Sequence, residues 1–202
     1  MKVWTVQPVE VYNQVMTTND YCVDLTKSLN AEFELFREPY AWLRKKAVER
    51  GLQDNGRGLI WFWYRRHSKR RKMDVRTMRK DAEKGSRMCC MTLDVPEDKV
   101  LLMDTSNWNA RINNSVCFTP EQEEMDLDAL ERFLDEFYDL PEEERKRRTE
   151  ESWELIFDFN PDKTGAIEGV FFGLDKEMIK DVQFFEGTGN PALEKLRNQP
   201  VI

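Results

Sequence analysis

The chain has 202 residues, of which 40% are hydrophobic and 34% charged, and its formal net charge is −7. This length suits one large domain, and the composition excludes a disordered or collagen-like protein. The longest apolar run, Leu59 to Tyr64, is far shorter than the ~20 residues of a membrane span. The first residues do not resemble a secretory signal, so we expect a cytoplasmic protein without a membrane partner.

Metal and disulfide chemistry find little support in the sequence. Cys22, Cys89, Cys90 and Cys117 are too few for a disulfide scaffold, and the adjacent pair would face opposite sides of a strand. His67 is the only histidine, so a zinc site would need an unusual set of ligands. We predict structural thiols and no metal site.

A strand that contains Thr5 and Gln7 opens the chain. Trp4 and Val6 point to one face of this strand, and Thr5 and Gln7 point to the other. Pro8 ends the strand, and the apolar residues that follow at helical spacing predict a helix directly after it. A buried glutamine without partners costs about 1–3 kcal/mol. Gln7 therefore caps the helix, bonds to its neighbours or faces a cleft.

A second helix and the most apolar strand come next. Apolar residues from Phe33 to Ala47 recur at helical spacing, and Pro39 predicts either a helix start near Glu38 or a kink. Leu59 to Tyr64 then forms a strand, in which Trp61 and Trp63 share one face. Core packing is the default role of these tryptophans, and stacking on an aromatic ring is the alternative.

Charge is unevenly distributed along the chain. Residues Arg65 to Lys80 contain nine basic residues and one acidic residue, a charge of +8, and lack an apolar period. We predict that this stretch is a mobile, exposed loop. Residues Glu121 to Glu144 contain twelve acidic residues and one arginine, a charge of −11. The two stretches could neutralise each other, or the basic one could bind an acidic macromolecular target, either protein or nucleic acid.

Two strands and a group of helices occupy the middle of the chain. The strands Arg87 to Val95 and Lys99 to Met103 flank a short turn, so they could pair directly or form a corner between sheets. Asp104 or Thr105 caps a short helix after them. An acidic helix starts at Thr119, and a further helix starts at Pro141. The acidic helix has four apolar residues that we expect to be buried: Leu127, Leu130, Leu134 and Phe137.

The last predicted elements are two strands, joined by residues 175–178. Strands at the beginning, middle and end, with helices grouped between them, indicate an α+β class. We predict one domain over residues 1–188 and a C-terminal tail over 189–202. Glu168 lies in an otherwise apolar strand, as a solvated edge residue or as a carboxylate in a cleft. Its neighbour Gly169 leaves room for a ligand or for another backbone.

Several segments resemble a bacterial and phage family, domain-of-unknown-function family 3841. They are VWTVQPVEVY, YAWLRKK, IWFWY, LDVPEDKVLLMDTSNWNARINN, SWELIFDF and IEGVFFGLDKEMIKDVQFF. The resemblance extends from Lys2 to about Glu186. Asn109 stands where the family usually has histidine, and Glu168 stands where it usually has glutamine.

The opening Thr-x-Gln-Pro is also similar to the first strand of small ADP-ribosyltransferase-like proteins. That likeness implies a split sheet and NAD as the substrate. It implies that Glu168 stabilises the positive charge that develops on the ribose, as the catalytic residue. The NAD-binding candidates are Thr5, Gln7, Tyr40, Trp61 and Asn109, with Tyr40 or Trp61 stacking on nicotinamide.

The function expected from this likeness is transfer or hydrolysis of ADP-ribose in conflict between phages and bacteria. A non-catalytic interaction protein, binding its partner through residues 65–80 and the acidic helix, is the first alternative. The second is an RNA-binding module that stacks bases on Trp61, Trp63 and Tyr64 beside the basic stretch. The sequence leaves the oligomeric state open.

Overall fold

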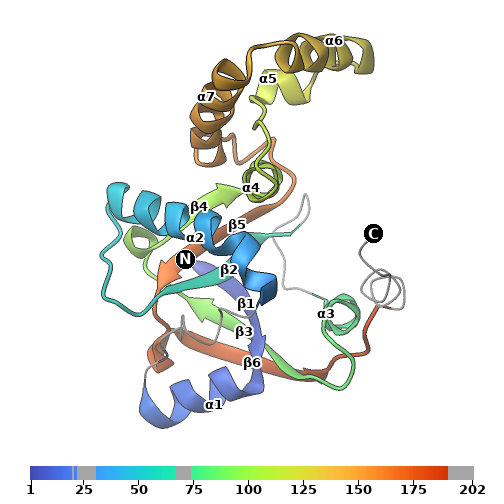
Figure 1. Ribbon diagram of the computed structural model, residues 1–202. Coiled ribbons are helices and arrows are strands. Elements are labelled where there is room, and N and C mark those ends of the chain that lie inside the picture. The colour runs from blue at the N-terminus through green and yellow to red at the C-terminus, as the bar shows by residue number, and fades with distance from the viewer. Residues whose placement is uncertain (20, 22–30, 67–73, 191–202) are drawn as a thin grey trace.

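The computed structural model describes residues 1–19, 21, 31–66 and 74–190 (Figure 1). Its six strands form one antiparallel sheet with the order β4-β5-β2-β1-β3-β6. The strands are β1 (Lys2–Pro8), β2 (Leu59–Arg65), β3 (Arg87–Asp94), β4 (Leu101–Asp104), β5 (Ile167–Phe172) and β6 (Ile179–Glu186). The α+β class is confirmed.

Helices connect these strands. The α-helices are α1 (Val9–Thr18), α2 (Ala31–Glu49), α3 (Val75–Asp81), α4 (Thr105–Ile112), α5 (Pro120–Glu123), α6 (Leu127–Tyr138) and α7 (Glu142–Ser152). Short 3-10 helices are η1 (Glu97–Lys99), η2 (Trp153–Ile156) and η3 (Lys176–Met178). The described helices are not long and apolar enough for any of them to cross a membrane.

Strands β1 and β2 are paired over a short stretch. All seven residues of β1 pair with β3, whereas Trp4 and Trp63 are the one β1–β2 register pair among the described residues. Beyond this pair a side chain joins the two strands, since the Thr5 hydroxyl donates to the Trp61 carbonyl at 2.7 Å. The Gln7 amide donates to the Thr5 hydroxyl at 2.9 Å. The sheet thus consists of two halves, β4-β5-β2 and β1-β3-β6, joined at a narrow junction.

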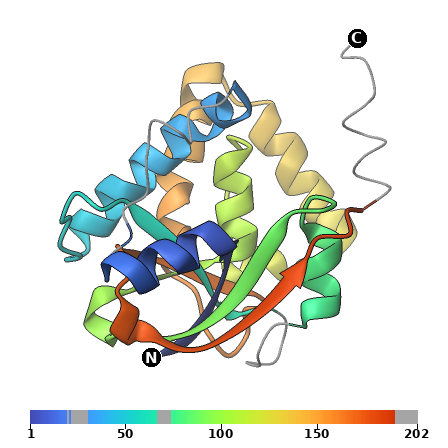
Figure 2. The ribbon, with the colours of Figure 1, turned by 90° about the horizontal axis from the view of Figure 1, so that it is seen from below.

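Helices cover both faces of the sheet, and α1 and α2 lie on different sides of it (Figures 1 and 2). Apolar residues of α1 pack with Val3 and Phe62 on one face. On the other face, α2 and α4 pack over Val170, while Met78 of α3 packs on Trp4. Burial of apolar area on both faces stabilises the central strands.

Part of the basic stretch is a docked helix, so the loop prediction is wrong for residues 74–80. Asp74 caps α3 by accepting the Arg76 backbone N–H at 2.9 Å. Met78 is buried, and Arg79 donates to the Glu186 carbonyl at 3.1 Å. The acidic cap and the buried methionine offset the mutual repulsion of the basic side chains. Residues 67–73 lie outside the described part of the chain.

Three other expectations on the helices and strands need correction. Helix α2 continues through Pro39, so it does not start near Glu38. Strands β3 and β4 do not pair, because β3 lies between β1 and β6 while β4 pairs with β5. The acidic helix is two helices, α5 and α6. Thr119 caps α5 with a capping box to Gln122, and Asp126 caps α6.

The leucines of α6 are the clearest failure of a burial prediction. Phe137 is buried, but Leu127 is 82% exposed, and Leu130 and Leu134 are half-buried. A helical apolar period predicts a buried face only when another element of the fold covers that face.

Other protein atoms occupy the space where Gly169 would carry a side chain. A Cβ at this position would lie 2.5 Å from the Phe62 ring and 2.6 Å from the Leu101 carbonyl oxygen. We expect Gly169→Ala to lower the free energy of unfolding by about 1–3 kcal/mol, because the core must shift to accept the methyl group. Urea denaturation measures this cost. The control Gly165→Ala meets nothing within 4 Å, and an equal loss in both variants would contradict the steric explanation.

Candidate functional site

Glu168 is buried in the interior of the sheet. It lies on β5, between β4 and β2, and is 6% exposed, so the solvated-edge alternative is wrong. Its cross-strand neighbours are Trp63 and Met103. The indole N–H of Trp61 donates to the carboxylate at 2.7 Å and fixes its orientation.

The surroundings of Glu168 raise its pKa and so favour the protonated form. Burial raises the pKa of Glu168 to about 7, the hydrogen bond from Trp61 opposes this shift, and the charge of Asp104 adds to it. The carboxyl group therefore exists in comparable amounts of its two forms at neutral pH. Carboxyls with such a pKa are frequent at catalytic sites, and structural ones also occur.

A cluster of three aromatic rings lies beside the carboxyl group. Tyr40 of α2 and Trp61 of β2 have ring centroids 5.3 Å apart, and Trp108 of α4 lies 5.3 Å from Trp61 and 6.0 Å from Tyr40. Burial and then the charge of Glu168 raise the pKa of Tyr40. Trp108 is buried, whereas Tyr40 and Trp61 remain partly exposed. The site therefore offers flat apolar surface next to a carboxylate.

Thr5 and Gln7 do not join this site. Side chains alternate along β1, so Gln7 shares the face of Val3 and Cys89, which α1 covers. Glu168 shares the other face with its register partner Trp63. The NAD-binding candidate Gln7 and the catalytic candidate Glu168 therefore lie on opposite faces of the sheet. The polar side chains of Thr5 and Gln7 instead bridge the junction between β1 and β2.

Asn109 is next to Trp108 in α4, but its side chain is exposed. Its backbone carbonyl accepts hydrogen bonds from Asn113 near the end of the helix. The structure therefore does not place the Asn109 side chain in the buried aromatic cluster.

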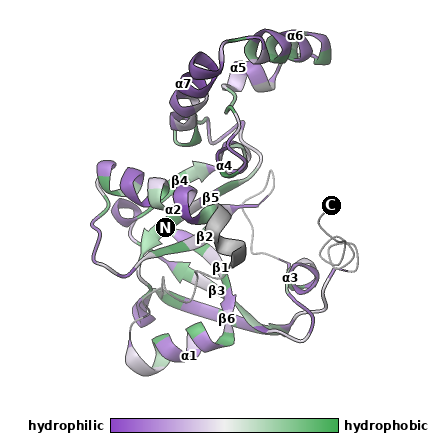
Figure 3. Cartoon of the chain, viewed as in Figure 1, coloured by the Kyte–Doolittle hydropathy of each residue, from purple (hydrophilic) through white to green (hydrophobic). Residues whose placement is uncertain are grey.

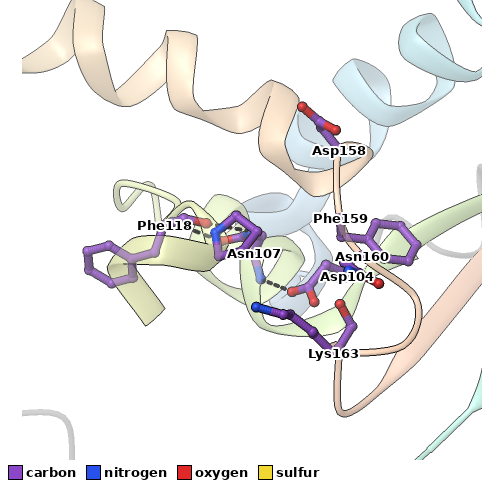
Figure 4. A pocket seen from close by; sticks show the side chains of 9 residues that line it. Asp104, Asn107, Phe118, Asp158, Phe159, Asn160 and Lys163 are labelled. Atoms are coloured by element: carbon purple, nitrogen blue, oxygen red, sulfur yellow. Dashed lines mark hydrogen bonds between the residues drawn. The ribbon is translucent and has the colours of Figure 1, made fainter. Parts of the chain in front are cut away.

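A small cavity lies near Asp104, lined by Asn107, Phe118 and Lys163 among others (Figure 4). The Asp104 carboxylate accepts the Asn107 backbone N–H at 2.8 Å and so caps α4, as one of the two predicted caps. The cavity measures about 20 Å³. That volume holds about one water molecule, so the cavity is too small for a substrate.

A buried arginine beneath α2 was not predicted from the sequence. Arg111 of α4 is 1% exposed, and its guanidinium lies 3.7 Å from the ring centroid of Trp153. It donates to the Glu38 carboxylate at 2.6 Å. An arginine in a helix normally predicts a solvated side chain, and the tryptophan beneath it comes from a distant segment.

The basic stretch and the tryptophans of β2 also have intramolecular contacts. Arg66 pairs with Asp81 at 2.7 Å and lies 5.6 Å from the ring centroid of Trp63. Arg65 donates to the carbonyls of Pro161 and Thr164. Within the described residues, these contacts favour a packing role for Trp63.

Comparison with known proteins gives one match. A family model described as "Domain of unknown function (DUF3841)" matches residues 2–180. The chain belongs to the DUF3841 family. The DUF3841 match extends from β1 to the start of β6 and includes Glu168, Tyr40 and Trp61. No curated protein and no solved structure matches.

Burial of Glu168 has a consequence for stability. The pKa of Glu168 is raised to about 7 from 4.5, so the folded state retains a proton that the unfolded state releases. Stability therefore falls as pH rises from about 4.5, and the loss is complete above about 7. We expect Glu168→Gln, which stays neutral, to be more stable than the parent by about 3 kcal/mol at pH ~8 and by less than ~1 kcal/mol at pH ~5.

Urea denaturation at both pH values measures this difference. The matched control is Glu10→Gln, because Glu10 is exposed on α1 over the opposite face. A gain at pH ~8 that persists at pH ~5 would show that burial of the charge is not its cause.

Proposed function

We propose that the protein binds NAD beside Glu168 and transfers or hydrolyses its ADP-ribose. The observation that carries the proposal is the Glu168 carboxylate, buried on an interior strand and held by the Trp61 N–H at 2.7 Å. Breaking the bond to nicotinamide leaves positive charge on the ribose. A carboxylate fixed in place before the reaction stabilises that charge without reorganisation.

The aromatic side chains give the site a way to hold the substrate. Tyr40 and Trp61 remain partly exposed beside Glu168, and the flat nicotinamide ring would stack on one of them. Trp61 would have a second role, because its N–H orients the carboxylate. Thr5 and Gln7 have no part in this revised site, since they lie on the other face.

The order of the strands supports the same proposal. The likeness to ADP-ribosyltransferase-like proteins implies a split sheet, whereas the six strands here form one sheet, in which β1 and β2 share the register pair Trp4 and Trp63. A first strand and a late strand with the glutamate both lie in the centre of the sheet, on either side of β2. This topology suits a substrate bound near the junction.

Two measurements test the proposal. Calorimetric titration with NAD measures binding, and mass spectrometry detects released nicotinamide and ADP-ribose, with and without acidic proteins and RNA as acceptors. We expect binding in the micromolar to millimolar range and consumption of NAD that requires Glu168. If NAD neither binds at about 1 mM nor is consumed, the proposal fails, and a non-catalytic interaction protein takes its place.

A further inference from the structure

Helix α6 has two adjacent apolar faces, and the fold covers one of them. Phe133 and Phe137 form the inner face, where the Phe133 ring lies 6.0 Å from that of Phe118. Leu127, Leu134 and Tyr138 lie about a quarter turn away, at the spacing of one helix face. The phenylalanines thus pack α6 against the rest of the molecule, whereas the second face faces outward.

This second face, called the leucine face below, is exposed. Leu127 is 82% exposed and Tyr138 is 58% exposed. The residues of this open surface all belong to α6: Leu127, Leu130, Glu131, Leu134, Asp135 and Tyr138. Adjacent exposed apolar side chains with a polar rim are typical of interaction sites.

The position of α6 leaves room for a partner. Helices α5, α6 and α7 form an arm that stands away from the sheet (Figure 1). Figure 3 shows hydrophobic and hydrophilic residues side by side along α6, as an amphipathic helix requires. Figure 1 shows α6 at the outer end of this arm, beyond α7 from the sheet.

The charge around the leucine face selects the kind of partner. Glu131 and Asp135 lie on this face, and α6 as a whole contains four acidic residues and Arg132, a charge of −3. Two copies of this face would bring like charges together, which disfavours a symmetric dimer through α6. A partner with basic residues around an apolar stripe would have the complementary charge.

We propose that the leucine face of α6 binds a basic amphipathic helix of a partner protein. Leucines of the partner would pack on Leu127, Leu134 and Tyr138. Its lysines or arginines would lie over Glu131 and Asp135 beside them. Pairing of two amphipathic helices through their apolar faces is a common mode of recognition.

The test uses the full chain and a synthetic helical peptide with leucines on one face and lysines on the other. Fluorescence anisotropy of the labelled peptide should show saturable binding that weakens with salt. We expect the double variant Leu127→Ser/Leu134→Ser to weaken binding at least about tenfold. Leu127 is exposed and Leu134 is half-buried, and circular dichroism checks that the variant stays folded.

Two controls make the result decisive. Val48→Ser removes an apolar side chain that is 45% exposed on α2, and it should leave binding unchanged. A peptide with glutamates in place of the lysines should bind at least about tenfold more weakly. Absence of saturable binding, equal binding of the acidic peptide, or a dimer that Leu127→Ser disrupts would each overturn the proposal.

Discussion

Replacing Glu168 by alanine is expected to lower the turnover of NAD by about 10²–10³-fold, the effect of removing one preorganised electrostatic group. Binding of intact NAD should change much less, because the positive charge on the ribose develops mainly in the transition state. Nicotinamide release at saturating NAD measures turnover, and calorimetry measures binding. The control Glu10→Gln, on the opposite face, should retain the parent rate.

The pH dependence of turnover gives a second result from the same residue. Burial raises the pKa of Glu168 to about 7, and the ionised carboxylate is the form that stabilises positive charge. Turnover should therefore rise with pH through about 7 and level off above it. Trp61→Phe removes the N–H that favours ionisation and should move this rise to higher pH. A rate that falls through the same range would instead identify protonated Glu168 as a general acid.

Removing Glu38 is expected to lower the free energy of unfolding by about 3 kcal/mol, although its own side chain is 72% exposed. Its partner Arg111 is 1% exposed, so Glu38→Ala leaves a buried guanidinium without its counter-charge. The rings of Trp153 and Trp42, with centroids 3.7 Å and 5.2 Å from that guanidinium, compensate only part of this loss. Urea denaturation at neutral pH measures the change.

A double-mutant cycle separates this charge effect from loss of packing. In an Arg111→Met background the buried group is apolar, and methionine can fill much of the space between Trp42 and Trp153. Glu38→Ala should then cost less than about 0.5 kcal/mol, because there is no buried charge to compensate. A cost that is the same in both backgrounds would assign the effect of Glu38 to helix α2 itself.

Local sequence features were enough to predict the elements close to the candidate site. The strand of Trp61 and the strand of Glu168 are short apolar runs, and both are strands of the sheet. Pro8 is followed at once by α1, and Thr119 forms a capping box with Gln122. These features depend on residues a few positions apart, where backbone geometry and capping hydrogen bonds act directly.

Strand order and register could not be predicted in the same way. Alternation along β1 separates Gln7 from Trp4, but it does not say which face Glu168 will share. That is decided when Trp4 pairs with Trp63, and Trp63 with Glu168. These pairings join segments far apart in the chain and depend on how all the apolar faces are buried together.

The sequence by itself therefore determined the class of the fold, the family, and Glu168 as an unusual carboxyl group on an apolar strand. Only the tertiary structure decided that Tyr40, Trp61 and Trp108 cluster beside that carboxyl group, while Gln7 lies on the opposite face of the sheet. It also decided that the leucines of α6 remain outside the core. The periodicity of the sequence around a side chain sets the direction in which it can point. The elements packed against it determine whether it contacts water, a charge or another ring.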